Sequence, residues 1–184
     1  MQYEITFAGF GGQGIMTAGK FLAQGAMNHG LEVAWVPSYG PEMRGGTAYC
    51  TVVISSKPVG SPVVKNPGIA VVMNRPSLDK FASQIKPDGI LIINSSLIEA
   101  TSEREDIFQV QVPCNKMSQE VLGIGRSANI AALGALLGVK EMIPKEEIEK
   151  VMETKFGKKP KILEDNLKIF RDAYELGKKQ RKNA

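Results

Sequence analysis

The chain has 184 residues, a formal net charge of +4 and 43% hydrophobic residues. Such a chain can bury a core without disulfides or metals, so one soluble domain over residues 1–184 is expected. No apolar run approaches the roughly 20 residues needed to span a bilayer, and the first residues lack the basic and apolar regions of a secretory signal. We therefore expect a cytoplasmic protein that works without a membrane.

Basic residues are concentrated near the C-terminus, in Lys178, Lys179, Arg181 and Lys182. A run of this kind after the last apolar stretch is typical of a solvated helix end. Nucleic-acid binding would instead need cations spread over a folded face, with aromatic side chains between them. We therefore do not expect a nucleic acid as a partner.

Residue types that carry out catalysis are scarce. Cys50 and Cys114 do not form a CxxC pair, so they are expected to be small buried side chains rather than zinc or cluster ligands. His29 is the only histidine and lies at the expected end of a helix. Glu103 and Glu105 fall in a polar stretch that is expected to be a solvated loop. We predict neither a catalytic residue nor a metal site in this chain, because no Ser/His/Asp or Cys/His set is available.

The first half of the chain alternates between strand and helix patterns. An apolar run at residues 5–8 predicts a buried strand. Small apolar residues at three- and four-residue steps over residues 15–26 predict a helix that ends near Gly30. Residues 33–36 predict a second strand, which would complete a βαβ-type opening. The β-branched alternation of residues 47–55 predicts a third strand.

The rest of the chain adds strands and then helices. Ser77 follows Pro76 and is expected to cap a helix over residues 77–84. Further strands are expected at 69–73, 90–93 and 107–112, and further helices at 127–137, 145–154 and 162–176. This order predicts an α/β fold: one Rossmann-like domain with a mainly parallel sheet and helices on both faces. The small side chains of residues 127–138 are expected to pack inside the domain rather than against a partner.

Glycines separate the first strand from the first helix. Gly9, Gly11 and Gly14 satisfy the G-x-G-x-x-G pattern in the place where that pattern has meaning. Such a turn lets a phosphate approach backbone N–H groups at the positive end of a helix. Tight packing of strand on helix would explain the glycines equally well. A dinucleotide site also needs an acidic residue at the end of the second strand, whereas Glu32 precedes that strand, so NAD binding is a minority hypothesis.

The connection after the second strand, residues 37–47, contains two prolines and three glycines together with Tyr39, Glu42 and Arg44. It should emerge at the same sheet edge as the glycine turn, where open α/β sheets bind ligands. The Arg44 guanidinium could pair with a phosphate or a carboxylate. An internal ion pair between Glu42 and Arg44 that only braces the connection is the equal alternative.

These segments and several later ones occur in the same order as in the gamma subunit of 2-oxoacid:ferredoxin oxidoreductases, which the chain resembles from about residue 5 to residue 140. Residues 37–47, which read PSYGPEMRGGT, are the specific part of the resemblance, whereas the glycine turn alone would not be. The matching segments are residues 9–14, 37–47, 51–55, 60–62, 73–81, 126–129 and 132–134.

The resemblance implies a gamma-type catalytic domain that has no catalytic residue of its own and works inside a complex. In this family, alpha and beta subunits bind thiamine diphosphate with Mg²⁺. Partner chains, including a delta ferredoxin-type subunit, carry iron–sulfur clusters. The assembly decarboxylates a 2-oxoacid, releases an acyl-CoA and passes electrons to ferredoxin. The gamma subunit is implied to help cover the active site and to bind coenzyme A.

Matches to the family's two loops, and to a polar residue after the third parallel strand, imply a set of coenzyme A contacts. They are Gly11, Gly12, Gln13, Gly14, Ser38, Tyr39, Glu42, Arg44, Gly45 and Asn74. Asn129 is expected to form a hydrogen bond near the same edge. The wording of residues 37–47 favours 2-oxoglutarate or a branched-chain 2-oxoacid over pyruvate.

Three alternatives stay open. One is the small subunit of an indolepyruvate oxidoreductase, within the same family. Another is a free-standing oxidoreductase that binds NAD(P) or FAD. The third is a purely structural subunit that touches no ligand.

Overall fold

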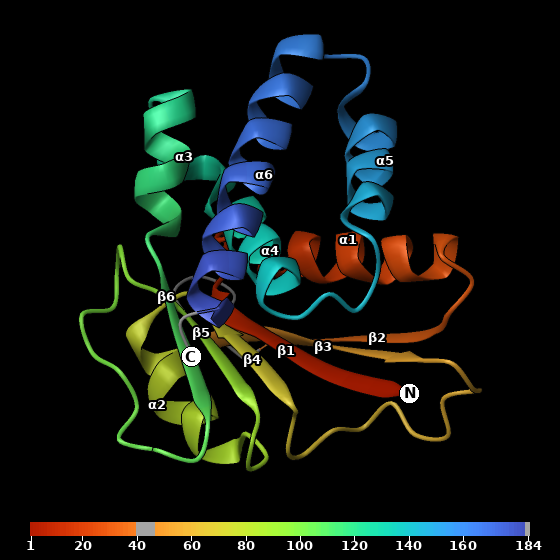
Figure 1. Cartoon of the computed structure of the whole chain (residues 1–184), viewed down its shortest axis with the longest axis vertical. Helices are drawn as coiled ribbons and strands as arrows, with labels where there is room; N and C mark the ends of the chain where they lie inside the picture. Colours follow the sequence, from red (N-terminus) through yellow and green to blue (C-terminus); the bar gives the residue numbers. More distant parts are fainter. Residues whose placement is uncertain (40–46, 183–184) are drawn as a thin grey trace.

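The computed structural model describes residues 1–39 and 47–182 (Figure 1). In these residues one mixed sheet runs through the molecule in the strand order β2-β3-β1-β4-β5-β6. The strands are β1 (Gln2–Phe10), β2 (Glu32–Tyr39), β3 (Thr47–Ser55), β4 (Ile69–Val72), β5 (Ile90–Asn94) and β6 (Phe108–Val112). All six strands predicted from the sequence are therefore present, and the α/β fold class is confirmed.

The parallel part of the sheet consists of β1, β4, β5 and β6. The expected βαβ opening is modified, because β3 lies between β1 and β2 and is antiparallel to both. Phe10 pairs with Thr47, and Tyr39 pairs with Ala48. The carboxyl ends of β1 and β2 therefore lie at one edge of the sheet, as the sequence predicted, with the start of β3 between them.

Helices cover the two faces of the sheet unequally. Figure 1 shows α2 on one face, and α1 with α3 to α6 on the other. The α-helices are α1 (Ile15–Asn28), α2 (Arg75–Phe81), α3 (Cys114–Leu122), α4 (Ala128–Val139), α5 (Lys145–Phe156) and α6 (Pro160–Lys182). Short 3₁₀ helices follow α2 and α3, at η1 (Ala82–Gln84) and η2 (Gly125–Ser127). None of the described helices has the length and apolar character to cross a membrane.

Two sequence predictions in this region were incomplete. The helix expected at residues 77–84 begins at Arg75, and its N-cap is Asn74 rather than Ser77. The Asn74 side chain accepts a hydrogen bond from the Ser77 backbone N–H at 2.9 Å, which is the geometry of an N-cap and N3 pair. Helix α3 was not predicted, although Cys114, Met117 and Val121 recur at three- and four-residue steps and pack against the main core.

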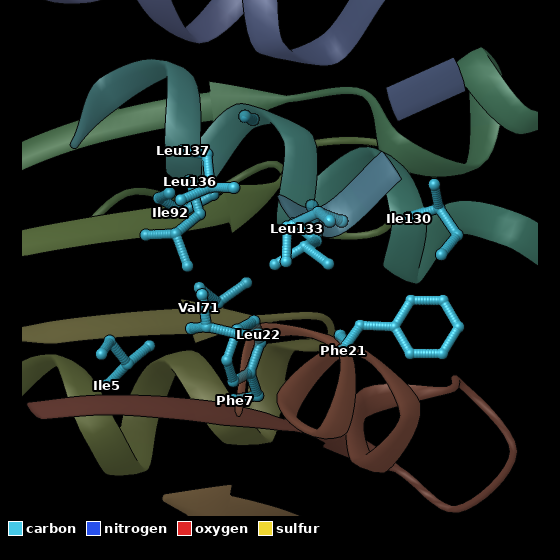
Figure 2. Packing of buried hydrophobic residues seen from close by; sticks show 14 of the residues in the cluster. Ile5, Phe7, Phe21, Leu22, Val71, Ile92, Ile130, Leu133, Leu136 and Leu137 are labelled. Atoms are coloured by element: carbon cyan, nitrogen blue, oxygen red, sulfur yellow. The ribbon is translucent and has the colours of Figure 1, made fainter. Parts of the chain in front are cut away.

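The main core lies between the sheet and the larger helical layer. Figure 2 shows Phe7 and Val71 from the strands facing Leu22 of α1, with Leu133 and Leu136 of α4 close by. A smaller core lies under α2, because alternate strand residues point to the other face. Both faces of β1, β4 and β5 are thus buried, which explains their nearly continuous apolar sequences.

Helices α4 and α6 approach so closely that their glycines contact backbone. A Cβ atom at Gly134 would lie 2.3 Å from the Phe170 carbonyl oxygen, and one at Gly138 would lie 2.0 Å from that of Tyr174. Every residue of α4 is buried. The prediction that the small residues of this helix pack inside the domain is confirmed, and α6 is the element they pack against.

The C-terminal basic run forms the end of α6, and Lys179, Arg181 and Lys182 are exposed, as expected of a solvated helix end. The helix extends to Lys182, and the Gln180 side-chain amide donates a hydrogen bond to the Gln111 carbonyl oxygen on β6 at 2.8 Å. This bond occupies an acceptor on the outer edge of the sheet. The end of α6 therefore attaches to the edge strand β6.

The glycine contact predicts a large effect of a small substitution. Gly138→Ala should lower the free energy of unfolding by about 1–3 kcal/mol, the usual range for overpacking, although alanine has the higher helix propensity. Urea denaturation of the isolated chain measures this difference. Gly60→Ala is the matched control, because nothing lies within 4 Å of a Cβ there, and its effect should stay within about 0.5 kcal/mol. Equal effects of the two substitutions would contradict the close contact.

The two cysteines are free and buried, as predicted. Burial raises the pKa of the Cys50 thiol to about 12, and burial also raises the pKa of Cys114. Since the thiolate is the reactive form, neither thiol should react with a thiol-specific reagent at pH 8 while the chain is folded. Both should react within minutes in urea. Rapid labelling of the native chain would contradict this placement.

Candidate functional site

The turn between β1 and α1 is held by glycines in left-handed backbone conformations. Gly12 has φ +93° and Gly14, the N-cap of α1, has φ +74°. Gly11 and Gly12 are exposed, and no atom lies within 4 Å of a Cβ built at Gly12. The first turn of α1 contains no acidic residue. This turn therefore presents an accessible, positively polarised helix end that suits an anion.

The side chain of Gln13 turns inward and braces this turn. Its Oε1 accepts a hydrogen bond from the Phe10 backbone N–H at 2.6 Å, and its Nε2 donates to the Met73 carbonyl oxygen at 3.1 Å. A Cβ at Gly9 would lie 2.6 Å from the same Oε1, which explains the glycine there. The amide of Gln13 thus joins the end of β1 to the end of β4.

Asn74 continues the brace at the end of β4. It is 3% exposed, and its Nδ2 donates to Gln13 Oε1 at 3.3 Å while its Oδ1 caps α2. The structure therefore brings Asn74 and the glycine turn together, as the sequence predicted. However, the amide groups of both Gln13 and Asn74 bond to protein atoms, so each holds the edge in shape.

Two further carboxamides extend this row along the sheet edge and were not predicted. Asn94 ends β5, is 1% exposed, and donates from Nδ2 to Asn115 Oδ1 at 2.8 Å. Asn115 follows β6 and is the second residue of α3. A signal was available, because an asparagine directly after the apolar run of residues 90–93 is unusual for the end of a buried strand.

The row of Gln13, Asn74, Asn94 and Asn115 is neutral at every pH of interest. Carboxamides donate and accept hydrogen bonds but do not act as general acids or bases. Among the described residues, no group of three His, Cys, Asp or Glu side chains is placed to hold a metal ion. These four side chains can therefore hold neighbouring groups in place but cannot transfer protons.

Asn129 latches the glycine turn from the far side. It is the second residue of α4, is 7% exposed, and its Nδ2 donates to the Gly14 carbonyl oxygen at 3.0 Å. A Cβ at Gly14 would lie 2.7 Å from the Asn129 amide. The expectation that Asn129 forms a hydrogen bond at this edge is confirmed, and its partner is the N-cap residue of α1.

The surroundings of the edge are open and carry cations. A hollow of about 670 Å³ lies beside it, lined by Arg75 and residues 96–100. Arg75 forms an ion pair with Asp79 at 2.8 Å, whereas Arg126 of η2 is exposed and forms no ion pair with a described residue. Because Glu99 also lines this hollow and Asp79 pairs with Arg75, the described rim of the hollow carries charges of both signs.

The other predicted contacts lie on or beyond the hairpin of β2 and β3. Ser38 pairs with Tyr49, which in turn pairs with Ala8, so Ser38 lies two strands away from the glycine turn. Tyr39 ends β2 at the same sheet edge. Glu42, Arg44 and Gly45 lie outside the described residues.

The latch predicts that the effects of Gly14→Ala and Asn129→Ala on stability are coupled. Gly14→Ala combines left-handed strain of about 1–2 kcal/mol with a clash against Asn129. In the Asn129→Ala background the clash disappears, so the double variant should be more stable than the sum of the single effects by about 1 kcal/mol. Gly12→Ala has the same strain without a neighbour, and should combine additively with Asn129→Ala. Denaturant titrations of the isolated chain measure the cycle; additivity at Gly14 would contradict the latch.

Comparisons with known proteins place the chain in a family. The family model described as pyruvate ferredoxin/flavodoxin oxidoreductase matches residues 4–176. The ketoisovalerate oxidoreductase subunit VorA of Methanothermobacter marburgensis is 38% identical over 97% of this chain, which spans 37% of that relative's length. The 2-oxoglutarate synthase subunit KorC of Methanocaldococcus jannaschii is 34% identical, with 97% of this chain and 95% of the relative covered.

Solved structures show the same fold. The gamma subunit of a keto/oxoacid ferredoxin oxidoreductase from Geobacter sulfurreducens aligns with a TM-score of 0.84 and 28% identity, covering 97% of this chain and 98% of the other. A 2-oxoglutarate:ferredoxin oxidoreductase from Magnetococcus marinus, solved with 2-oxoglutarate, coenzyme A and succinyl-CoA bound, aligns with a TM-score of 0.89 and 28% identity. That alignment covers 97% of this chain and 31% of the other. The chain belongs to the pyruvate ferredoxin/flavodoxin oxidoreductase family, as a gamma-type subunit or domain.

Proposed function

We propose that this chain is the gamma subunit of a complex that converts a 2-oxoacid and coenzyme A to an acyl-CoA, with ferredoxin as electron acceptor. The observation that carries the proposal is the shared sheet edge. The open glycine turn at the start of α1 lies at the same edge as the strand ends flanking residues 40–46. The related Magnetococcus enzyme was solved with coenzyme A and succinyl-CoA bound.

Coenzyme A suits this edge chemically. It carries phosphate groups, which backbone N–H groups at a helix N-terminus bind well. We assign that contact to Gly11, Gly12 and Gly14. Arg44 would pair with a phosphate through two parallel hydrogen bonds. Ser38, Tyr39, Glu42 and Gly45 would complete the contact from the second loop.

The brace refines the roles of Gln13 and Asn74. Their amides bond to Phe10, Met73 and Ser77 of the chain itself. We therefore infer that both residues serve the ligand indirectly, by fixing the turn whose backbone meets it. A preformed turn lowers the entropy lost when the ligand binds.

The redox and decarboxylation chemistry would lie in other subunits. Thiamine diphosphate with Mg²⁺ would be held by alpha and beta subunits, and iron–sulfur clusters by partners that include a delta ferredoxin-type subunit. Cys50 and Cys114 are buried separately and offer no cluster site in the described residues. The cofactors supply electron storage and carbanion stabilisation, and this chain supplies a shaped cover.

The substrate is proposed to be 2-oxoglutarate or a branched-chain 2-oxoacid. Relatives named for both substrates are similar to this chain at 34% and 38% identity. Substrate choice is assigned to the partner subunits, since the edge described here faces coenzyme A. A free-standing dinucleotide enzyme is less well supported, because Glu32 pairs with Ser55 at the opposite end of the sheet from the glycine turn.

Arg44→Ala tests the proposal in the assembled complex. Loss of a charge-assisted bond to phosphate should raise the KM for coenzyme A about tenfold, and leave the KM for the 2-oxoacid unchanged. Steady-state kinetics with ferredoxin or a dye acceptor measure both constants. Lys158→Ala, in the connection between α5 and α6, is the matched control.

An unchanged KM for coenzyme A in Arg44→Ala would favour the purely structural subunit. Calorimetry on the isolated chain with NAD(P)H and FAD tests the alternative of a free-standing dinucleotide-binding oxidoreductase. Tight dinucleotide binding there would contradict the proposal.

A further inference from the structure

One half of the sheet lacks a helix on its second face. In Figure 1 α2 lies beneath the part of the sheet that contains β4 and β5, whereas only the connection between β3 and β4 passes beneath β3. The smaller core accordingly draws on β1, β4 and β5, with Tyr49 of β3 only partly buried against it. Among the described residues, β2 and β3 are thus covered by helices on one face alone.

The register shows which side chains occupy this face. Val36 pairs with Thr51, and Thr51 pairs with Thr6. Side chains in directly opposite positions project from the same face of a sheet. Thr6 and Thr51 are 3% and 7% exposed, so two hydroxyls are buried where the helical cover ends. On the neighbouring strands β4 and β5, the positions in line with Thr6 are the apolar residues Ala70 and Leu91.

These hydroxyls form the floor of a hollow of about 310 Å³. Its walls come from Tyr49 of β3, from α2 and from the β3–β4 connection. The Tyr49 and Phe81 rings meet edge to face at a centroid distance of 5.1 Å, which makes a rigid wall. The residues that line the hollow are Thr6, Tyr49, Thr51, Val64, Lys65, Pro67, Lys80, Phe81 and Gln84.

The hollow has positive charge without a counter-charge. Lys65 and Lys80 line it, and no Asp or Glu does. Lys80 Nζ lies 4.7 Å from the centroid of the Tyr49 ring and 5.0 Å from that of Phe81, so the rings hold the ammonium in place. Neither lysine forms an ion pair within the described ranges, 1–39 and 47–182. An incoming carboxylate would complete the arrangement.

Apolar side chains flank the hollow. Val36 on β2 is 40% exposed, and Val63, two residues before Lys65, is 75% exposed. A small free anion would gain nothing from these valines, whereas a protein segment would bury them while its carboxylate meets the lysines. The domain forms only 37% of VorA and 31% of the Magnetococcus chain, so in those relatives it is joined to further polypeptide.

We infer that the face of β2 and β3 that no described helix covers docks an acidic segment of another subunit of the complex, with a carboxylate entering the hollow beside Lys65 and Lys80. The inference shares one premise with the proposed function, namely that the chain works as a subunit of a complex. It does not depend on coenzyme A binding, because the hollow lies on the face under the sheet rather than at its carboxyl edge.

The test is assembly of the complex, purified through an affinity tag on this chain. Lys65→Glu combined with Lys80→Glu should weaken capture of the partner about tenfold or more, since like charges then face each other. Lys65→Arg with Lys80→Arg should retain capture. Lys158→Glu with Lys159→Glu, on the helical side, applies the same charge change elsewhere and should leave capture intact.

A second variant separates loss of docking from loss of folding. Val63→Glu changes an exposed side chain, so its urea midpoint should match that of the unaltered chain while capture falls. Normal capture by folded Lys65→Glu/Lys80→Glu chains would overturn the inference. So would equal loss in the Lys158/Lys159 control, or a stabilisation of the isolated chain by inorganic phosphate that these substitutions abolish. If the unaltered chain captures no subunit, the proposed function itself fails.

Discussion

The antiparallel ladder between β1 and β3 sets most of what is distinctive in this structure. It pairs all residues of β1, from Gln2 with Ser55 to Phe10 with Thr47. Because β3 occupies that position, β2 is displaced outward and its end returns to the edge where the glycine turn opens. Because β2 remains parallel to β1, the loops that follow these two strands still lie at one edge, as in a simple βαβ unit, with the start of β3 between them. The same insertion creates a stretch of sheet that α2 is too short to cover.

The polar groups at this edge are neutral, and that choice has a physical reason. A charged side chain buried at the 1–3% exposure of Asn94 and Asn74 would need a partner or lose its charge. A carboxamide can satisfy a donor and an acceptor at once, so a few of them tie four strand ends together. Because these carboxamides carry no charge, they do not neutralise the positive N-terminus of α1, which stays available to an anion.

Much of the fold could be predicted from local pattern. The apolar run of β1, the glycine turn and the β-branched alternation of β3 identify their elements because each depends on neighbours in sequence. The small residues of α4 indicated close packing, although their partner in α6 is a long-range fact. The place of β3 between β1 and β2 could not be predicted. An alternation of apolar and polar residues identifies a strand, but it does not show which other strand that strand pairs with.

The sequence patterns indicated the edge at which the candidate residues lie, but not the hydrogen bonds that they form there. Gln13 and Asn74 were assigned to a ligand because they stood in family motifs, and both lie at the edge where the glycine turn opens. Their inward hydrogen bonds depend on the Met73 carbonyl and on the space left by Gly9, neither of which a sequence pattern reveals. Ser77 was taken for the cap because it follows a proline, but the proline is itself in the first turn of α2.

The hydrogen bond from Gln180 to the β6 backbone has a consequence for solubility. The two edge strands of a sheet carry unpaired backbone N–H and C=O groups, to which a strand of a second chain can pair, and such pairing is a common start of aggregation. At the β6 border the tail of α6 occupies an acceptor that such a strand would need. At the β2 border Pro37 lacks the N–H that a regular ladder requires. Each border thus lacks one hydrogen-bonding group that an added strand would use, which disfavours edge-to-edge pairing between copies of this chain.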